Sequence, residues 1–272
     1  MTSARTPSPA ASGSGFRYRA DDAELKQHAR ALPVLSSDAR FAVHAVGGSS
    51  PAAVLGRTVE AQVFDEFFGN DTELMQGEYG PYEESSAFLL AIDLRDQVCA
   101  GVVRLILPSS AGLKSLNDIR NPAGPWGAAV APDGNGSING VELPHEATID
   151  VATLAVAPAY RSRTSAAGVS VALLSSCIGF SDEHGYSHWV AILDMVPFSL
   201  IQAFGEPFLR FPGLDPAPYL DSGQSLPVHL ELSSAHERVR HNNRDAYRLL
   251  VEREGLRDKY VFADHLPDPA AP

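Results

Sequence analysis

The stretch from residue 148 to residue 193 limits the possible fold more than any other part of the chain. Residues 148–156 form an apolar segment typical of a buried strand, residues 165–183 form a long, largely apolar helical segment, and residues 187–193 are strand-like again. Gly185 follows the helical segment, where a helix commonly ends on a left-handed residue. A strand, a helix and a strand of these lengths predict a right-handed crossover between two parallel strands of one sheet.

The segments before this unit predict a helix and a hairpin. Residues 54–68 carry large apolar side chains every four residues, from Leu55 to Phe67, which predicts a helix with one apolar stripe. Residues 86–93 and 98–107 are apolar, and the polar residues between them predict a β-hairpin. The other predicted elements are a helix after residue 20, strands near 39–46, 208–211 and 226–232, a short helix at 197–204 and a charged surface helix over 233–260.

The distribution of small and polar residues predicts how the chain is divided. Residues 1–18 have few large apolar side chains, so we expect a loose tail there, followed by one folded domain over residues 19–232. Residues 233–272 are expected to form a C-terminal surface helix and tail. Within the domain, residues 108–147 are rich in Pro and Gly and too long for an ordinary connection, as is typical of loops that form lids or binding walls.

Composition excludes several classes of function. The 21 Lys and Arg against 33 Asp and Glu give a net charge of −12, which argues against nucleic acid as a partner. The sequence has only two cysteines, Cys99 and Cys177, both next to apolar residues, so we expect reduced core thiols and a cytoplasmic protein. No stretch approaches the roughly 18 apolar residues of a membrane span, and neither a membrane nor a secretory signal is predicted.

The turn after the first strand of the crossover unit is a candidate anion site. A strand that passes through a short turn into a helix directs backbone N–H groups and a helix dipole at one point, where a diphosphate is favoured. Arg161 and Arg163 add positive charge to this turn. The alternative interpretation, two solvated arginines in an ordinary strand-to-helix turn, stays open at this point.

This turn resembles the donor-binding motif of the GNAT superfamily of N-acyltransferases. In that superfamily an apolar strand of the form Leu-x-Val leads into a loop with the pattern Arg or Gln, x, x, Gly, x, Gly or Ala, which holds the diphosphate of an acyl thioester. Thr164 replaces the middle glycine of the pattern. The donor-binding residues implied by the resemblance are Leu154, Ala155, Val156, Arg161, Ser162, Arg163, Thr164, Ser165 and Ala166.

The resemblance implies a mixed α/β fold. We expect a central, mostly antiparallel twisted sheet with one parallel β-α-β donor-binding unit and flanking helices. From about residue 54 to residue 232, the chain is most similar to the branch that contains acyl-homoserine lactone synthases and long-chain N-acyl amino acid synthases. The matching features, in order, are Val63 and Phe64, the turn at residues 78–83, Gly101, Arg104, Leu105, Pro108 and the block at residues 190–205.

Four positions depart from the lactone synthases. Their arginine before the helix phenylalanine is Glu60 here and their tryptophan after it is Asn70. The glutamate that opens their donor-binding strand is Asp150, and the arginine three residues later is Thr153. Because those residues shape the S-adenosylmethionine pocket in the lactone synthases, the departures argue against lactone synthesis and favour acyl transfer to another amine.

Asp150 is the first candidate for a catalytic base. An amine attacks a thioester only as the free base, so a proton acceptor is needed near it, and Asp150 interrupts an apolar strand, where burial raises the pKa of a carboxyl. The alternative is a structural role, with Asp150 paired to Arg104 or capping a loop. Arg104 and Glu83 are further candidates, either to hold the acceptor or, as we favour, to form an ion pair between the turn and the sheet.

The remaining expectations concern the substrates. Trp189, Phe198 and Phe204 are candidates for an acyl-chain pocket, although aromatic residues are more often ordinary core. GNAT members commonly carry a leaving-group tyrosine in the helix after the second strand, but residues 197–204 offer only Ser199. No metal is expected. An acidic protein repels acidic carrier proteins, which favours acyl-coenzyme A as the donor, with a small amine as acceptor and a homodimer as an open possibility.

Three functional hypotheses follow from the sequence. The first is an N-acyltransferase that moves an acyl group from acyl-coenzyme A to a primary amine. The second is a GNAT-shaped module that binds an acyl thioester or a partner without catalysis, suggested by Thr164 and by the missing tyrosine. The third is acyl-homoserine lactone synthesis.

Overall fold

A computed structural model describes residues 16–33, 35, 38–131, 137–161 and 166–266. The strands are β1 (Phe41–Gly47), β2 (Ser86–Asp93), β3 (Val98–Ile106), β4 (Thr148–Val156), β5 (His188–Asp194), β6 (Leu209–Arg210), β7 (Ala217–Tyr219), β8 (Ser222–Glu231) and β9 (Tyr260–Ala263). The α-helices are α1 (Asp22–Ala31), α2 (Ala53–Phe68), α3 (Thr72–Tyr79), α4 (Lys114–Arg120), α5 (Ala166–His184), α6 (Met195–Gln202), α7 (Leu232–Asn242) and α8 (Arg244–Leu250). Short 3₁₀ turns are η1 (Gly80–Ser85), η2 (Gly127–Ala129), η3 (His145–Ala147) and η4 (Pro158–Tyr160).

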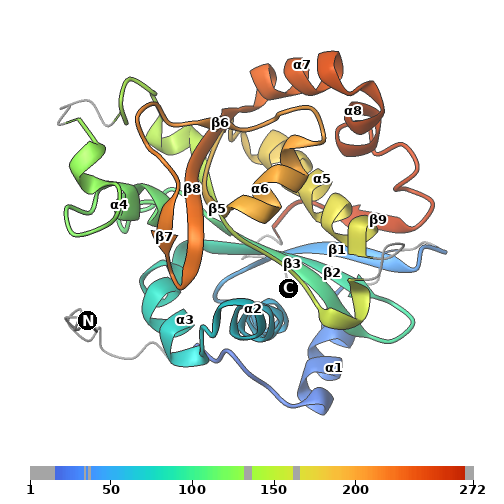
Figure 1. Ribbon diagram of the computed structural model, residues 1–272. Coiled ribbons are helices and arrows are strands. Elements are labelled where there is room, and N and C mark those ends of the chain that lie inside the picture. Colours follow the sequence, from blue (N-terminus) through green and yellow to red (C-terminus); the bar gives the residue numbers. More distant parts are fainter. Residues whose placement is uncertain (1–15, 34, 36–37, 132–136, 162–165, 267–272) are drawn as a thin grey trace.

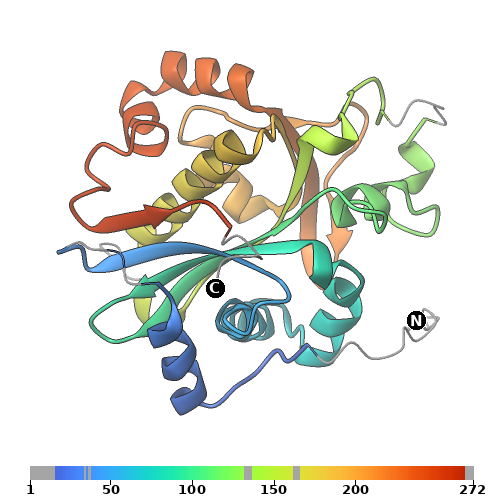
Figure 2. The same cartoon turned by 180° about the vertical axis from the view of Figure 1, so that it is seen from behind.

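The described strands form one mixed sheet with helices on both faces (Figure 1 and Figure 2). The order is β6-β8-β5-β4-β3-β2-β1-β9, with β7 paired to β8. β4–β5 and β1–β9 are parallel pairs and the other named pairs are antiparallel. In Figure 1, α1, α2 and α3 lie below the sheet, and α5 to α8 lie above it. The predicted fold class, hairpin and parallel crossover are therefore confirmed.

Glycines let the two main helices approach the sheet closely. A Cβ on Gly56 of α2 would lie 2.8 Å from Phe88 and 2.9 Å from Val102, both on the sheet. A Cβ on Gly101 of β3 would lie 2.8 Å from Val169 of α5. These contacts place the sheet between two apolar layers, one under α2 and one under α5.

The N-terminal boundary differs from the predicted loose tail. Residues 1–15 lie outside the described part, but Tyr18 is 4% exposed and its hydroxyl donates to Glu83 Oε1 at 2.8 Å. A tyrosine with a buried partner is held as firmly as a core residue. The packed segment therefore begins before residue 19, because a polar partner at a distance of 65 residues in sequence fixes the aromatic ring.

The prediction of one helix over residues 233–260 is wrong. The structure has two helices, α7 and α8, separated at Asn243, whose side chain accepts a hydrogen bond from Ala246 N at 3.0 Å and so starts a new helix. The chain then returns to the sheet as β9, parallel to β1, and Tyr260 stacks on Phe41 with ring centroids 5.1 Å apart. The C-terminal segment thus completes one edge of the sheet.

Three elements lie where the sequence pattern predicts none. Helix α3 follows Asp71, which accepts a hydrogen bond from Leu74 N at 2.8 Å as a helix N-cap. Helix α4 lies within the stretch predicted to be irregular, and β7 precedes β8. Among the described residues, no helix is long and apolar enough to cross a bilayer.

Candidate active site

The candidate site lies where β4 and β5 separate. The two strands pair in parallel only from Thr148 with His188 to Asp150 with Val190. Beyond this point β4 continues along β3 to Val156, while β5 continues along β8. The β4 backbone from residue 151 onwards therefore has no β5 partner in the described ladder, which leaves its polar groups available to another extended molecule.

A β-bulge lies at the same place. Arg104 of β3 pairs with Thr153 and Leu105 pairs with Val151, so the register passes over Ala152. An extra residue in one strand breaks the alternation of side chains between the two faces. As a result Asp150, which contacts α4, and Thr153, which contacts α2, both reach the lower face of the sheet.

Asp150 is fully buried next to the first turn of α4. Its Oδ2 accepts a hydrogen bond from Ser115 N at 2.6 Å and its Oδ1 accepts one from Ser115 Oγ at 2.8 Å. Burial raises the pKa of Asp150 to about 6, against the opposing hydrogen bonds from Ser115 and the positive charge of Lys114. The partner is therefore Ser115 in the first turn of α4 and not Arg104. A carboxyl with a pKa of about 6 is suited to act as a general base.

Lys114 forms a second polar group beside Asp150. Its Nζ lies 2.6 Å from Asp118 Oδ2, 2.9 Å from Glu78 Oε2 and 2.8 Å from the Tyr219 hydroxyl. Burial alone would lower the pKa of Lys114, but the surrounding oxygens raise it well above its ordinary value. This charged lysine joins α4 to α3 and to the β7–β8 hairpin, and so holds the region that presents Ser115 to Asp150.

Arg104 is the centre of a buried ion-pair cluster. Its Nε and Nη2 donate to Glu60 at 3.0 and 2.7 Å, and its Nη1 donates to Glu83 Oε1 at 2.9 Å. All three side chains have no exposed area. The cluster extends to Tyr18, whose hydroxyl accepts from Arg104 Nη2 at 3.2 Å, to Arg57, which donates to Glu83 Oε2 at 3.0 Å, and to Thr153, which donates to Glu60.

These contacts include the ion pair between the turn and the sheet that we favoured for Arg104 and Glu83. Burial alone would raise the pKa of Glu83, but Arg104 and Arg57 outweigh it, and the pKa lies below its ordinary value. Every nitrogen of the Arg104 guanidinium has a protein partner. A role for either residue in acceptor binding stays a prediction.

The predicted donor-binding residues are described only in part. Ser162, Arg163, Thr164 and Ser165 lie outside the described residues, and α5 begins at Ala166. In β4, Ala155 packs against the α2 side of the sheet, whereas Leu154 and Val156 pack against the core under α5. The strand and the helix of the predicted motif are therefore present on either side of the turn.

Arg161 is held at the end of β4. Its Nε donates to Val156 O at 2.7 Å, and its Nη1 lies 2.8 Å from both carboxylate oxygens of Glu66. The guanidinium carbon lies 4.7 Å from the centre of the Phe67 ring. Within the described residues, Nη2 is buried and has no hydrogen-bond partner. An unpartnered buried donor is unfavourable and is satisfied by an added oxygen ligand.

The three aromatic candidates for an acyl pocket lie on the upper side of the sheet. Trp189 is 3% and Phe198 is 6% exposed, both within the core cluster under α5, and Phe204 packs against that cluster. Ser199, the only hydroxyl in the following helix, donates to Met195 O at 2.8 Å. An acyl-binding role for the aromatic residues stays a prediction.

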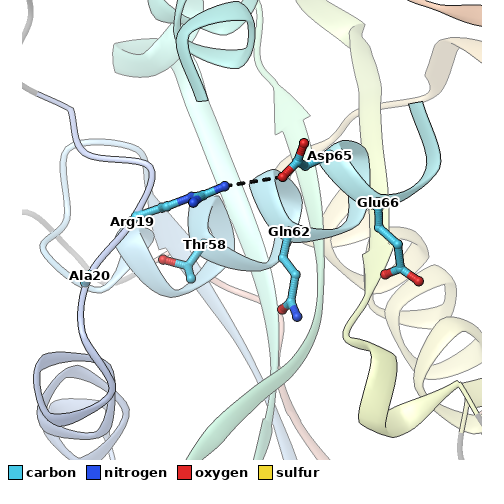
Figure 3. Close-up of a pocket in the computed structure, with 6 residues that line it drawn as sticks. All are labelled: Arg19, Ala20, Thr58, Gln62, Asp65 and Glu66. Atoms are coloured by element: carbon cyan, nitrogen blue, oxygen red, sulfur yellow. Dashed lines mark hydrogen bonds and ion pairs between the residues drawn. The ribbon is translucent and has the colours of Figure 1, made fainter. Parts of the chain in front are cut away.

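A groove of about 520 Å³ lies on the outer face of α2, away from Asp150. It is lined by Arg19 and Ala20 of the N-terminal segment and by Thr58, Gln62, Asp65 and Glu66 of α2. Figure 3 shows that Asp65 points towards Arg19, while Glu66 points the other way. The described residues include no group of three or more metal-binding side chains.

Sequence reasoning missed several residues of this region. Ser115, Lys114 and Tyr219 come from segments without a motif, and they meet Asp150 or each other across 35 to 105 residues of sequence. Glu66 was likewise missed, since it is one of several charged residues on α2. The polar residues on either side of Leu116, Ser115 and Asn117, offered no signal that distinguishes them from a solvated loop.

The mostly antiparallel sheet with its parallel crossover and flanking helices is consistent with the GNAT fold that the sequence resemblance implies. No protein-family profile matches the sequence, and no curated protein is detectably similar to it. Among solved structures, the chain is similar to FeeM, an N-acyl amino acid synthase from uncultured soil microbes, with a TM-score of 0.52, 11% identity, and coverage of 75% of this chain and 96% of FeeM.

Two further structures have lower TM-scores. One is BjaI, a CoA-dependent acyl-homoserine lactone synthase with SAM and isopentyl-CoA, at 0.47 and 15% identity, with coverage of 81% of this chain and 92% of BjaI. The other is a putative N-acetyltransferase from Lactobacillus plantarum, at 0.45 and 12% identity, with coverage of 70% and 99%. The likeness to FeeM establishes a common fold, as the sequence resemblance predicts.

Proposed function

We propose that this protein is an N-acyltransferase that transfers an acyl group from acyl-coenzyme A to the primary amine of a small molecule. The observation that carries the proposal is the buried Asp150 at the point where β4 and β5 separate. The GNAT fold supports an acyl thioester as the donor, and the separated strands provide an edge along which an extended donor can bind.

The proposed reaction is a direct acyl transfer. The amine nitrogen attacks the thioester carbonyl, a C–N bond forms and the C–S bond breaks. The proton lost by the amine passes to Asp150, directly or through water, because a carboxyl with a pKa of about 6 is ionised at neutral pH. Backbone N–H groups of β4, near the bulge at Ala152 and onwards to Leu154 and Val156, stabilise the developing oxyanion.

The leaving thiolate needs less assistance than an alkoxide would. Ser199 is a weak acid, and its hydroxyl hydrogen bonds to Met195 O within its own helix. The thiolate therefore departs without a dedicated acid and takes its proton from solvent. On the donor side, we assign contact with the diphosphate to Arg161, whose Nε hydrogen bond to Val156 O at the end of β4 supports this role.

The proposal is tested by incubating the protein with acyl-coenzyme A donors from acetyl to palmitoyl and a panel of amines, while free thiol is measured. We expect amine-dependent thiol release, and a loss of about 10²- to 10⁴-fold in the turnover rate for Asp150→Asn. Asp93→Asn is the matched control, because Asp93 is equally buried but lies beside Arg40 at the far end of the hairpin. That variant should lose stability and keep its turnover rate.

The results that would contradict the proposal are specific. Absence of thiol release above background with every donor would count against acyl transfer. Donor binding by calorimetry, combined with no turnover, would instead favour a non-catalytic thioester-binding module. Formation of methylthioadenosine from S-adenosylmethionine would favour lactone synthesis.

A further inference from the structure

The only charged partner of Arg161 among the described residues is Glu66, and solvent can reach the Glu66 side chain. One edge of the guanidinium is fixed by the last residue of β4, through the bond from Nε to Val156 O at 2.7 Å, and the guanidinium carbon lies 4.7 Å from the centre of the Phe67 ring. The negative charge at Nη1 comes from Glu66, whose side chain is 47% exposed. The Arg161 side chain itself is only 23% exposed.

The contact between Glu66 and Arg161 differs from a bidentate arginine–carboxylate pair. Both carboxylate oxygens lie 2.8 Å from the same nitrogen, Nη1, and Nη2 is left without a partner in the described part of the chain. A parallel pair would use two nitrogens and satisfy both. Among the described residues, Arg161 Nη2 therefore has no acceptor, and Nη1 is occupied by a carboxylate that solvent can also reach.

We propose that Glu66 is the counter-ion that the diphosphate of the donor must displace from Arg161, so that Glu66 sets the affinity for the acyl-coenzyme A donor. This inference rests on the proposed function. It deepens that function by assigning a residue of α2, outside the turn itself, to the control of donor binding.

The sign of the effect follows from comparing two roles of Glu66. If Glu66 positioned Arg161, removing its charge would weaken donor binding, but Val156 O and the Phe67 ring already hold the guanidinium. If Glu66 competes with the donor, removing its charge raises the positive potential at the turn. Since the positioning contacts remain without Glu66, the charge term decides, and the donor binds more tightly.

Glu66→Gln isolates this charge, because the amide oxygen can still accept a hydrogen bond from Arg161. Asp65→Asn is the matched control: it makes the same change in net charge one residue earlier, but its side chain points to Arg19 whereas Glu66 points the other way, as Figure 3 shows. Both side chains are about half exposed, so neither substitution disturbs the core.

The experiment is calorimetric titration of coenzyme A into the wild-type protein, the two single variants, Arg161→Gln and the double variant Glu66→Gln/Arg161→Gln. We expect Glu66→Gln to bind about two- to fivefold more tightly, as expected for an exposed ion pair, and Asp65→Asn to differ by less. In the Arg161→Gln background the gain from Glu66→Gln should disappear, and raising the salt concentration should reduce it.

Each outcome decides between the two proposals. Equal or weaker binding by Glu66→Gln, while the wild type binds coenzyme A, would overturn the role of Glu66 and leave the proposed function intact. A gain of the same size in Asp65→Asn, or one that persists without Arg161, would also overturn it. If coenzyme A binds to neither the wild type nor Glu66→Gln, both this inference and the proposed donor are wrong.

Discussion

Two buried carboxyl groups on the same face of the sheet have pKa values that are shifted in opposite directions. Glu83 and Asp150 both have no exposed area. The pKa of Glu83 lies below its ordinary value, because Arg104 and Arg57 outweigh the effect of burial. The pKa of Asp150 is raised to about 6, because its hydrogen-bond partner is the uncharged Ser115. The charge of the partner decides whether a buried carboxyl remains an anion or becomes a usable proton acceptor.

The Arg104 cluster has a structural role, whereas the surroundings of Asp150 leave a carboxyl that can accept a proton. The Arg104 cluster joins β3, α2, the η1 turn and the N-terminal segment, and its charges are mutually neutralised. Next to Asp150, the nearby cation Lys114 already has two carboxylate partners, so it lowers the pKa of Asp150 only in part. The first cluster holds the central strand β3 against α2 and the η1 turn. The second leaves the Asp150 carboxyl without a cation of its own.

The largest expected effect is the loss of the Arg104 side chain. Arg104→Met should lower the free energy of unfolding by about 3–5 kcal/mol, because Glu60 and Glu83 would keep their burial and lose their partner. Urea denaturation at pH 7 measures this. Arg40→Met is the matched control, since Arg40 pairs with the buried Asp93 from an exposed position and should have a smaller effect. Equal losses in the two variants would contradict the structural role assigned to Arg104.

The next effect is the pH dependence of stability. A carboxyl whose pKa is raised in the folded state stabilises that state below the unfolded pKa, near 4, and this contribution is lost as the pH rises through about 6. Relative to Asp150→Asn, the wild type should therefore lose about 2 kcal/mol of unfolding free energy between pH 4 and pH 7. Urea denaturation of both proteins across this range provides the measurement.

Asp93→Asn provides a control of opposite sign for this experiment. Burial alone would raise the pKa of Asp93, but the bonds from Arg40 and from the Asp96 and Arg95 backbone N–H groups keep it lowered. Its contribution to stability is present above its ordinary pKa and is lost as the pH falls. As the pH rises, the free energy of unfolding of the wild type should therefore increase relative to Asp93→Asn and decrease relative to Asp150→Asn. Two slopes of the same sign would contradict the assignment.

Much of the fold follows from local patterns in the sequence. The β4–α5–β5 crossover and the β2–β3 hairpin were predictable because their apolar segments are long and bounded by clear turn residues. The C-terminal helix was not, because a single residue, Asn243, starts a new helix, and the short run at Tyr260 becomes a strand only by pairing with β1. Such pairings depend on contacts across more than 200 residues.

The sequence allows one residue of the candidate site, Asp150, to be predicted, but not the residues that surround it. Asp150 could be found because a charge interrupts an apolar strand. Its partner Ser115 lies in a stretch rich in Pro and Gly, where no periodicity marks α4. The bulge at Ala152 adds to this difficulty: with regular alternation Asp150 and Thr153 would face opposite sides of the sheet, and only the pairing with β3 shows that both lie beneath it.

The smallest of these effects is a shift caused by Ser115, and it tests the comparison most directly. Ser115→Ala removes the hydroxyl that donates to Asp150 Oδ1 at 2.8 Å, but the backbone N–H at 2.6 Å remains. Since the lost bond favours the ionised carboxyl, the pKa of Asp150 should rise further, by about one unit for a hydrogen bond to a charged group.

The pH dependence of kcat/KM for acyl transfer measures this shift. If Asp150 is the base, the rate should fall at low pH with a midpoint near 6 in the wild type and about one unit higher in Ser115→Ala, while Ser115→Thr restores the wild-type midpoint. A variant with a lower maximal rate and an unchanged midpoint would mean that Ser115 supports only the packing of α4. The midpoint does not depend on how much enzyme is folded. It therefore distinguishes an effect of Ser115 on the pKa of Asp150 from an effect on the packing of α4 alone.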